Sequence, residues 1–539
     1  MSPRAALYPA LALVLGTTLP APPASSLAAQ GATPPAALDP WSPLVPVGDL
    51  VHELPGLHHF PALLTEPAPR SGLHWTAGNP AGLAFELTAP RQEFRMGRTR
   101  SEGDYRRPLD PARVDGLGFG GNAWQPLDGT GGLVGRIAVA RNAMDDAFAN
   151  TAFPYTSSPH TVMDTSGTAL GQSVARIEGA GGWRIGRWGL GLSAGYETLD
   201  TRTRAAPIAR HFRYTRPAAT AGVARDLGAT RIGLHARWQG GSQTTQLAPR
   251  QGIGTVRAYR IRAFDAPRMI ELDQGFFTQV ARRRATAVGV SAAGAAGPLA
   301  WTAYAETAAL RENQAISMEN DPPLDTWVAR GGAGGLALAM TLAEGRLELF
   351  GDARFQWLSG EAGRADLDDI AAVYEAAETR ALTRAELRYL PGAGWTAAVR
   401  LTAERTARDR QDHVVRLAFD HVGWSAGAAV EVARDLTDRL ALAGAVGGAR
   451  FTPMGSLPNP EAAGPALRRY VSPELMLAGT PSTALGASLT GLWRRRAGGG
   501  IWIRGRYDTS SPEMAGSRLP LAPEGDRSGW GLELGMRLH

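Results

Sequence analysis

Apolar and polar residues alternate strictly along several stretches of the chain. In one of them, Ile232, Leu234 and Trp238 alternate with His235 and Arg237. The same alternation recurs at residues 346–357, 395–404, 501–508 and 529–539. A period of two residues places the apolar side chains on one face of a strand and the polar side chains on the other. The pattern therefore predicts a sheet whose two faces contact different surroundings.

Two features of these segments favour a membrane barrel over a soluble β-sandwich. The segments run about 10 to 14 residues, which exceeds the usual soluble strand and suits a tilted membrane crossing. Trp and Tyr recur near their ends, as at Trp188, Trp238, Trp357 and Trp395, where the aromatic girdles of a membrane barrel are expected. The sequence predicts an all-β fold, a single large transmembrane antiparallel β-barrel of roughly 18 to 22 strands.

Links of two lengths join the predicted strands. Short links are expected at residues 226–228, 343–345, 391–394 and 436–438. Longer links are expected at residues 142–168, 243–254, 312–325, 359–372, 452–466 and 510–528. Alternation of short turns and long loops is typical of outer-membrane barrels. Between about residues 420 and 500 the alternation is imperfect, which indicates a short outer loop or a miscounted strand.

Composition agrees with an exported β-structure and excludes one class of partner. The 539 residues include 66 glycines and no cysteine, and all 56 basic residues are arginine. An absence of cysteine suits an oxidising cell envelope. The formal net charge is +6, with acids and arginines interspersed, so nucleic-acid binding is not expected.

The N-terminal residues predict export. Residues 1–29 are expected to be a signal peptide: Arg4 is followed by a mostly apolar stretch, a proline cluster and the small residues Ala28 and Ala29. No apolar run of about 18 residues follows residue 30, so a membrane crossing by helices is not expected. Residues 30–78 are rich in proline and are expected to form an irregular periplasmic or lumenal segment. Residues 79–539 are expected to form the barrel, in the cell outer membrane.

A short motif stands at the predicted start of the barrel. Asn79, Pro80 and Ala81 precede a stretch, residues 83–87, that is expected to be the first strand. This motif resembles the Asn-Pro-Ala sequence at the N-terminus of long-chain fatty-acid transporter barrels, although Asn-Pro also commonly starts a turn. The overall layout resembles the uncharacterised outer-membrane β-barrel families of diderm bacteria, which implies a location and a fold but no substrate.

Charged residues on the predicted polar faces are the candidates for lining the lumen. They are Arg231, His235, Arg237, Arg260, Arg262, Arg346, Glu348, Asp352, Arg354, Arg384, Glu386, Arg388, Arg400, Glu404, Arg504, Arg506 and Asp508. In a water-filled pore such residues tune ion selectivity. Alternatively they form cross-strand arginine–carboxylate pairs that stiffen the wall. The two interpretations are compatible.

Other reactive groups predict little chemistry. The histidines His52, His58, His59 and His74 do not have the spacing of a usual metal site, and the acidic residues near Asp366 to Asp369, with Glu375 and Glu378, are expected to form a solvated loop. Two Gly-x-Ser-x-Gly sequences surround Ser193 and Ser425, but no helix is expected after either serine, as a nucleophile elbow requires. Neither a metal, a cofactor nor an enzyme activity is therefore expected.

The sequence favours a channel or porin-like transporter for a small-molecule solute. A non-transporting barrel that acts as partner or scaffold of an envelope complex is the alternative, and an outer-membrane enzyme is a second one. The expected partners are outer-membrane lipid, lipopolysaccharide and the barrel-assembly machinery.

Overall fold

The computed structural model divides the chain into residues 1–36 and residues 37–539, and all described residues belong to the second unit. The described residues are 78–86, 90–104, 111–127, 129–149, 160–205, 208–249, 256–262, 268–272, 277–316, 325–364, 373–392, 394–413, 417–454, 480–495, 499–513 and 525–538. The expected signal peptide and nearly all of the proline-rich segment lie outside them.

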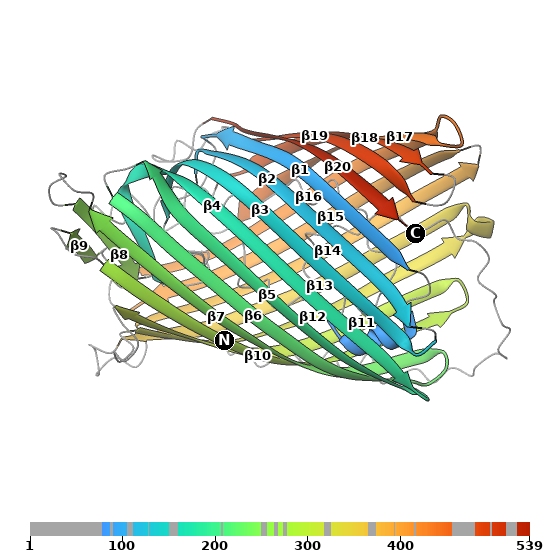
Figure 1. Ribbon diagram of the computed structural model, residues 1–539, viewed down its shortest axis with the longest axis horizontal. Coiled ribbons are helices and arrows are strands. Elements are labelled where there is room, and N and C mark those ends of the chain that lie inside the picture. Colours follow the sequence, from blue (N-terminus) through green and yellow to red (C-terminus); the bar gives the residue numbers. More distant parts are fainter. Residues whose placement is uncertain are drawn as a thin grey trace. The chain divides into compact units, whose positions relative to one another are not determined.

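Eighteen antiparallel strands form a closed barrel (Figure 1). They are β1 (Arg91–Gly103), β2 (Arg113–Leu127), β3 (Gly131–Ala149), β4 (His160–Ile185), β5 (Trp188–Ala205), β6 (Ile208–Asp226), β7 (Thr230–Pro249), β10 (Phe277–Ala296), β11 (Leu299–Ile316), β12 (Asp325–Leu342), β13 (Leu347–Arg364), β14 (Tyr374–Gly392), β15 (Trp395–Asp412), β16 (Leu417–Asp435), β17 (Leu440–Met454), β18 (Ser482–Arg494), β19 (Gly500–Pro512) and β20 (Arg527–Leu538). The predicted fold class is confirmed, and the strand number lies at the lower end of the expected range.

The first and last strands close the barrel. β1 pairs with β20 along its length, from Gln92 opposite Leu538 to Gly103 opposite Arg527. Closure leaves the ring without an open edge, which is the condition for a sheet to span lipid.

Two further strands lie outside the ring. β8 (Val256–Arg262) and β9 (Arg268–Leu272) form a hairpin within the link between β7 and β10. β8 pairs with the first residues of β4, His160 to Asp164. The hairpin therefore extends the sheet beyond one end of the barrel (Figure 1).

Short turns and longer links alternate around most of the barrel, but residues 206–207 between β5 and β6 and residues 413–416 between β15 and β16 are short links on the long-loop side. At Asp226, the side-chain Oδ1 accepts a hydrogen bond from the Gly228 nitrogen at 2.9 Å, and Gly228 has a φ of +94°, which glycine adopts without strain. Between residues 420 and 500, one long link joins β17 to β18, and short links precede and follow these strands. Just before this region, β15 and β16 are joined on the long-loop side by the four residues 413–416 alone, and the short turn 436–439 follows directly. A short outer link therefore lies next to the region where the alternation was expected to fail.

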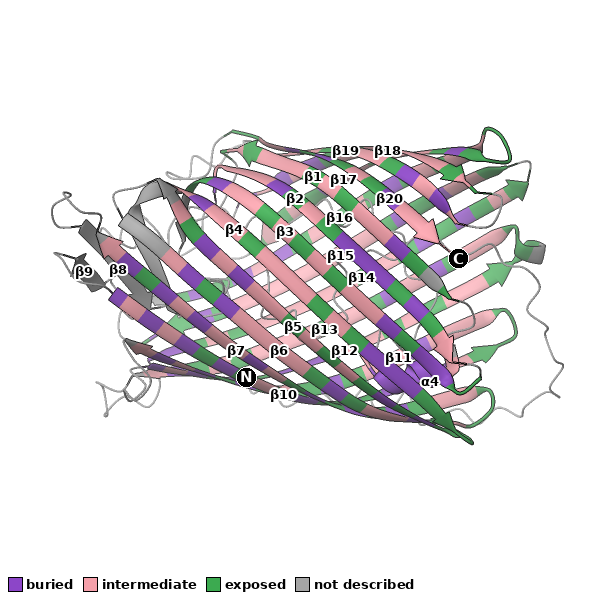
Figure 2. Cartoon of the chain, viewed as in Figure 1, coloured by how far each residue is buried: buried purple, intermediate pink, exposed green. Residues whose placement is uncertain are grey.

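Most barrel strands are longer than predicted, and their lengths range from 12 residues in β20 to 26 in β4. Most of the predicted long links begin or end inside a strand: β7 continues to Pro249 and β11 to Ile316. Buried and exposed residues alternate along the strands (Figure 2). Large apolar side chains such as Ile232, Leu234 and Val288 are exposed on the outer face, so the outer surface is the one suited to lipid.

The prediction that residues 83–87 form the first strand is wrong. Pro80–Gly82 forms the 3₁₀ helix η3, and Leu83–Glu86 forms the one-turn helix α4. Asn79 caps η3, because its side chain accepts a hydrogen bond from the Ala81 nitrogen at 3.0 Å, and proline suits the first helical position. Among the residues that the structure describes, no helix is both long and apolar enough to span a bilayer.

Candidate functional site

The inner face of the barrel carries the charged side chains that the alternation predicts. On β7, His235 and Arg237 are buried, whereas Leu234 and Trp238 are exposed on the other face. Charged groups are buried without large cost only when they are paired and hydrogen-bonded. The candidate functional site is therefore this inner wall and the contacts that neutralise its charges.

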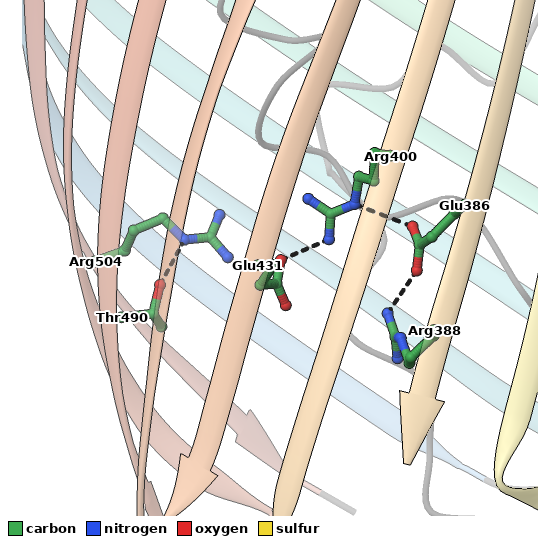
Figure 3. A network of polar contacts seen from close by, with 6 residues as sticks. All are labelled: Glu386, Arg388, Arg400, Glu431, Thr490 and Arg504. Carbon is green, nitrogen blue, oxygen red and sulfur yellow. Dashed lines mark hydrogen bonds and ion pairs between the residues drawn. The ribbon is translucent and has the colours of Figure 1, made fainter. Parts of the chain in front are cut away.

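A chain of arginines and glutamates crosses three strands, β14 to β16 (Figure 3). Arg388 Nη2 donates to Glu386 Oε1 at 2.9 Å, and Arg400 Nε donates to Glu386 Oε2 at 3.0 Å. Arg400 Nη2 then donates to Glu431 Oε2 at 2.5 Å. The Glu386 side chain is 3% exposed and that of Glu431 is 29% exposed. The chain thus runs from a buried carboxylate between two arginines to a carboxylate that retains access to the lumen.

Arg504 belongs to a looser group on the neighbouring part of the wall. Its Nε donates to Thr490 Oγ1 at 3.1 Å (Figure 3), and its Nη1 lies 3.9 Å from Glu533 Oε2. Arg380 on β14 makes two hydrogen bonds to Glu404, at 2.7 and 3.2 Å. Both arginines stay partly exposed, with 30% and 38% of their side chains accessible. These pairs keep charge available at the lumen surface.

A second buried group bridges strands that are not neighbours. His235 on β7 lies 3.1 Å from Glu306 on β11, Nε2 to Oε2, and Arg237 donates to the other oxygen of Glu306. β10 lies between these strands and presents Gly289 at this point. A Cβ atom on Gly289 would overlap the imidazole of His235. The missing side chain therefore creates the path by which His235 reaches Glu306.

A third group lies nearer the long loops, on β10 and β11. Arg283 pairs with Glu312, Gln314 Nε2 donates to Glu312 Oε1 at 2.6 Å, and Gln279 donates to Gln314. All four residues are buried. Apart from Arg283, which stands out in the sequence with Arg282 and Arg284, the sequence reasoning did not select these residues, nor Glu306, Arg380 or Glu431. The alternation of apolar and polar residues in β10 and β11 could have predicted that the polar residues of these strands face inward.

The Asn-Pro-Ala motif docks on the inner wall beside β4 to β7. Asn79 Nδ2 lies 3.3 Å from each of three acceptors, the carbonyl oxygens of Val223 and Leu234 and the hydroxyl of Ser291. A Cβ atom on Gly191, Gly222 or Gly233 would overlap this segment. We call these three glycines the glycine seat. Asn79 is fully buried, so the motif is a docking element of the wall.

The helix α4 continues this docking through its aromatic residue. The guanidinium carbon of Arg184 lies 5.3 Å from the centre of the Phe85 ring, and that of Arg231 lies 5.1 Å from it. Such distances allow cation–π attraction. Arg231, a predicted lumen residue, therefore faces inward and contacts the N-terminal segment.

The structure places the remaining candidates in different surroundings. Asp352 and Arg354 on β13 form an ion pair at 2.8 Å, and Arg384 and Arg388 stand in register opposite Asp352 and Glu348. Arg506 and Asp508 stand opposite Gly531 and Gly529, and their side chains occupy the space left by these glycines. Arg346 differs from the expectation, because it is exposed in the turn before β13. Arg260 and Arg262 lie on β8, and their side chains fall outside the described part of the chain.

The other reactive groups do not converge in the described residues. Ser193 and Ser425 lie within β5 and β16, away from any strand-to-helix turn. Glu375 and Glu378 lie on β14, where they contact His413 at 3.2 Å and Arg408 at 3.3 Å. Within the described ranges, no group of three His, Asp or Glu residues could hold a metal ion. The four histidines before residue 75 and the acidic residues 366–369 lie outside these ranges.

A closed antiparallel barrel with an apolar outer band and a charged interior defines a transmembrane β-barrel protein. The chain matches the family of unknown function DUF6850 over residues 80–538. It belongs to this family, whose matched region begins within the Asn-Pro-Ala motif. No curated protein sequence matches the chain.

The fold is similar to those of solved outer-membrane transporters, at low identity. The FrpB iron transporter from Neisseria meningitidis, F5-1 variant, has 11% identity and a TM-score of 0.40, with 85% of this chain and 83% of that chain covered. The copper transporter OprC has 10% identity and a TM-score of 0.38, with 83% and 80% covered. The ferric yersiniabactin uptake receptor FyuA from Yersinia pestis has 11% identity and a TM-score of 0.36, with 84% and 80% covered.

Proposed function

We propose that the protein is an outer-membrane channel that passes a small polar solute through its lumen. The observation that carries the proposal is the inner wall of a closed 18-strand ring, which presents charged residues on β7, β10, β11 and β13 to β16. Barrels of 16 to 18 strands are wide enough to leave an aqueous channel. Inside this ring, the described residues place one short segment, Asn79 to Glu86, against one side of the wall.

The lining supports passage of polar solutes with weak charge selection. Arginines and carboxylates alternate across the wall, as in the chain from Arg388 through Glu386 and Arg400 to Glu431. Rings of one sign select ions strongly, whereas mixed signs select weakly. The wall pairs also stiffen the barrel, so the two interpretations of the charged residues hold together in this proposal.

The natural absence of cysteine allows a direct test. Thr402 faces the lumen on β15, and Thr383 faces outward on β14; each donates a hydrogen bond at 3.4 Å to a carbonyl oxygen of the next strand. The two threonines occupy nearly the same height, because Thr402 stands opposite Arg384 and Thr383 stands opposite Ala403. Thr402→Cys and Thr383→Cys are therefore a matched pair.

Each variant is reconstituted in a planar bilayer, and its conductance is recorded before and after a charged, water-soluble thiol reagent is added. We expect the unmodified variants to conduct and the reagent to reduce the current through Thr402→Cys alone. An absence of conductance in both variants and in the wild-type protein would contradict the channel. Equal effects of the reagent on both variants would show that current does not follow this lumen.

The proposal includes a membrane setting and assigns no catalytic role. In an outer membrane, lipopolysaccharide and the barrel-assembly machinery are the partners that we expect. Ser193 and Ser425 lie mid-strand, away from the strand-to-helix turn that a nucleophile elbow requires, so we propose no hydrolase. No described feature favours the scaffold alternative.

A further inference from the structure

A row of arginines lies on the outer surface of three consecutive strands. Arg284 on β10, Arg311 on β11 and Arg330 on β12 are all exposed and face away from the lumen. Arg284 stands directly opposite Arg311, and Arg330 stands opposite Ala309, the residue two positions before Arg311 on the same face. We call these three residues the arginine row.

The depth of the arginine row is the same on each strand. Each arginine lies twelve positions from the short-turn end of its strand, at Ala296, Leu299 and Leu342 respectively. A tilted strand needs about 9 to 11 residues to cross the hydrocarbon layer. The row therefore lies just outside the apolar band, on the side of the long links.

Two tryptophans mark the same boundary. Arg284 stands opposite Gly240, two positions beyond Trp238, and Arg330 stands opposite Ser359, two positions beyond Trp357. Both tryptophans lie on the outward-facing side of their strands. Because Trp residues gather at the level of the headgroups, the arginine row lies at the level where lipid phosphates lie.

The arginine row has no carboxylate to neutralise it. Elsewhere on the outer face, Arg100 pairs with Glu102, Arg202 with Asp200, and Arg450 with Glu513. Among the outward-facing described residues of β7 and β10 to β13, the one acid is Glu361, which stands opposite Val328. No described residue forms an ion pair with a member of the row.

Direct opposition of like charges destabilises a sheet unless a counter-charge is present. The direct opposition of Arg284 and Arg311 therefore favours an anion from outside the described residues at this level. Arginine holds phosphate with two parallel hydrogen bonds, and its charge persists at any physiological pH. An anion that stays at the headgroup level must belong to a lipid.

We propose that the arginine row is a binding site for the phosphate groups of lipid A, the membrane anchor of lipopolysaccharide. This inference rests on the outer-membrane placement proposed above. The long links lie on the side of the barrel that faces the outer leaflet in such membranes, which is where this phosphorylated glycolipid resides. The site deepens the expected contact with lipopolysaccharide by assigning residues to it.

The test uses the delipidated, folded full-length protein in detergent and native mass spectrometry. Three probes are compared: bis-phosphorylated lipid A, the same lipid with its phosphates removed, and phosphatidylglycerol. The test variant replaces Arg284, Arg311 and Arg330 by serine. The control variant replaces Arg100, Arg202 and Arg450 by serine, which removes the same number of outward-facing, half-exposed or exposed arginines that already have partners.

We expect the wild-type protein and the control variant to bind bis-phosphorylated lipid A about tenfold more tightly than either other probe, and the test variant to lose that preference. Retention of the preference by the test variant would overturn the proposal. Equal binding of phosphatidylglycerol by the wild-type protein would overturn the assignment to lipid A.

Conductance of the same preparations separates this proposal from the channel. We expect the test variant to conduct as the wild-type protein does, because the arginine row lies outside the lumen. Loss of lipid A binding with retained conductance supports both proposals. Binding that depends on the row in a protein that does not conduct would contradict the channel alone.

Discussion

His235 contacts Glu306 across an entire intervening strand, with 3.1 Å between Nε2 and Oε2. Pairing across a sheet normally joins direct neighbours. Here Gly289 on β10 leaves the space through which the imidazole passes. One glycine thus decides whether three strands share one buried polar group, and this dependence leads to the first prediction.

We expect Gly289→Ala to destabilise the barrel by about 1 to 3 kcal/mol, because the added methyl group displaces His235 from a buried carboxylate. Gly505→Ala is the control, since a Cβ atom there would meet nothing within 4 Å. Urea unfolding of the reconstituted protein measures both. In a protein that already carries His235→Ala, Gly289→Ala should lower the free energy of unfolding by less than it does in the wild-type protein. An equal loss in both proteins would show that the imidazole is not the group displaced.

Glu386 and Glu404 should respond differently to loss of charge. Glu386→Gln leaves Arg388 and Arg400 buried with a weaker acceptor, so we expect a loss of about 1 to 3 kcal/mol. Glu404→Gln weakens a pair whose arginine is 38% exposed, so we expect a loss of at most about 1 kcal/mol. Unfolding of both variants by urea in the same bilayer tests the ranking, and a larger loss for Glu404→Gln would contradict it.

The N-terminal segment should detach when Asn79 loses its amide. Asn79→Ala removes the donor to three acceptors, and Asn79→Asp also places oxygen against the carbonyl oxygens of Val223 and Leu234. We expect faster amide hydrogen exchange in residues 79–86 in both variants, more so in Asn79→Asp, with exchange in β10 to β20 unchanged. An aspartate variant that exchanges no faster than the alanine variant would contradict this account.

The glycine seat gives an independent test of the same docking. A Cβ atom on Gly191 would overlap the backbone of Pro80 and Ala81, so Gly191→Ala should expose the chain near residue 80 to added protease. Gly444→Ala, at a glycine with nothing within 4 Å of a built Cβ, should leave cleavage unchanged. Equal cleavage of the two variants would show that the segment does not depend on the seat.

Alternation predicted the barrel because a strand between lipid and water needs contrasting faces. The same alternation misplaced the strand ends, because the two faces of a strand contrast only where one of them contacts lipid. On β7 the outward residues beyond Trp238 include Ser242, Thr244 and Gln246, so the contrast disappears although the strand continues to Pro249. Strand length outside the membrane is set by backbone pairing, which the side-chain pattern does not report.

The N-terminal motif shows what local sequence could not predict. Leu83, Ala84 and Phe85 are compatible with a short strand or a helical turn, because so short an apolar run does not separate the two. Whether this segment docks as a helical turn depends on Gly191, Gly222 and Gly233, which lie more than a hundred positions later. Likewise, alternation placed Glu386 and Arg400 on the inner face, but only the strand register brought them together.

The docking of Asn79 has a consequence for the order of assembly. Its three acceptors lie 144, 155 and 212 residues further along the chain, on β6, β7 and β10. The motif is made before any barrel strand, yet its partners are complete only after β10 has joined the sheet. The part of the described chain that is synthesised first is therefore among the last to reach its final position. Its burial requires that more than a third of the barrel wall has already formed.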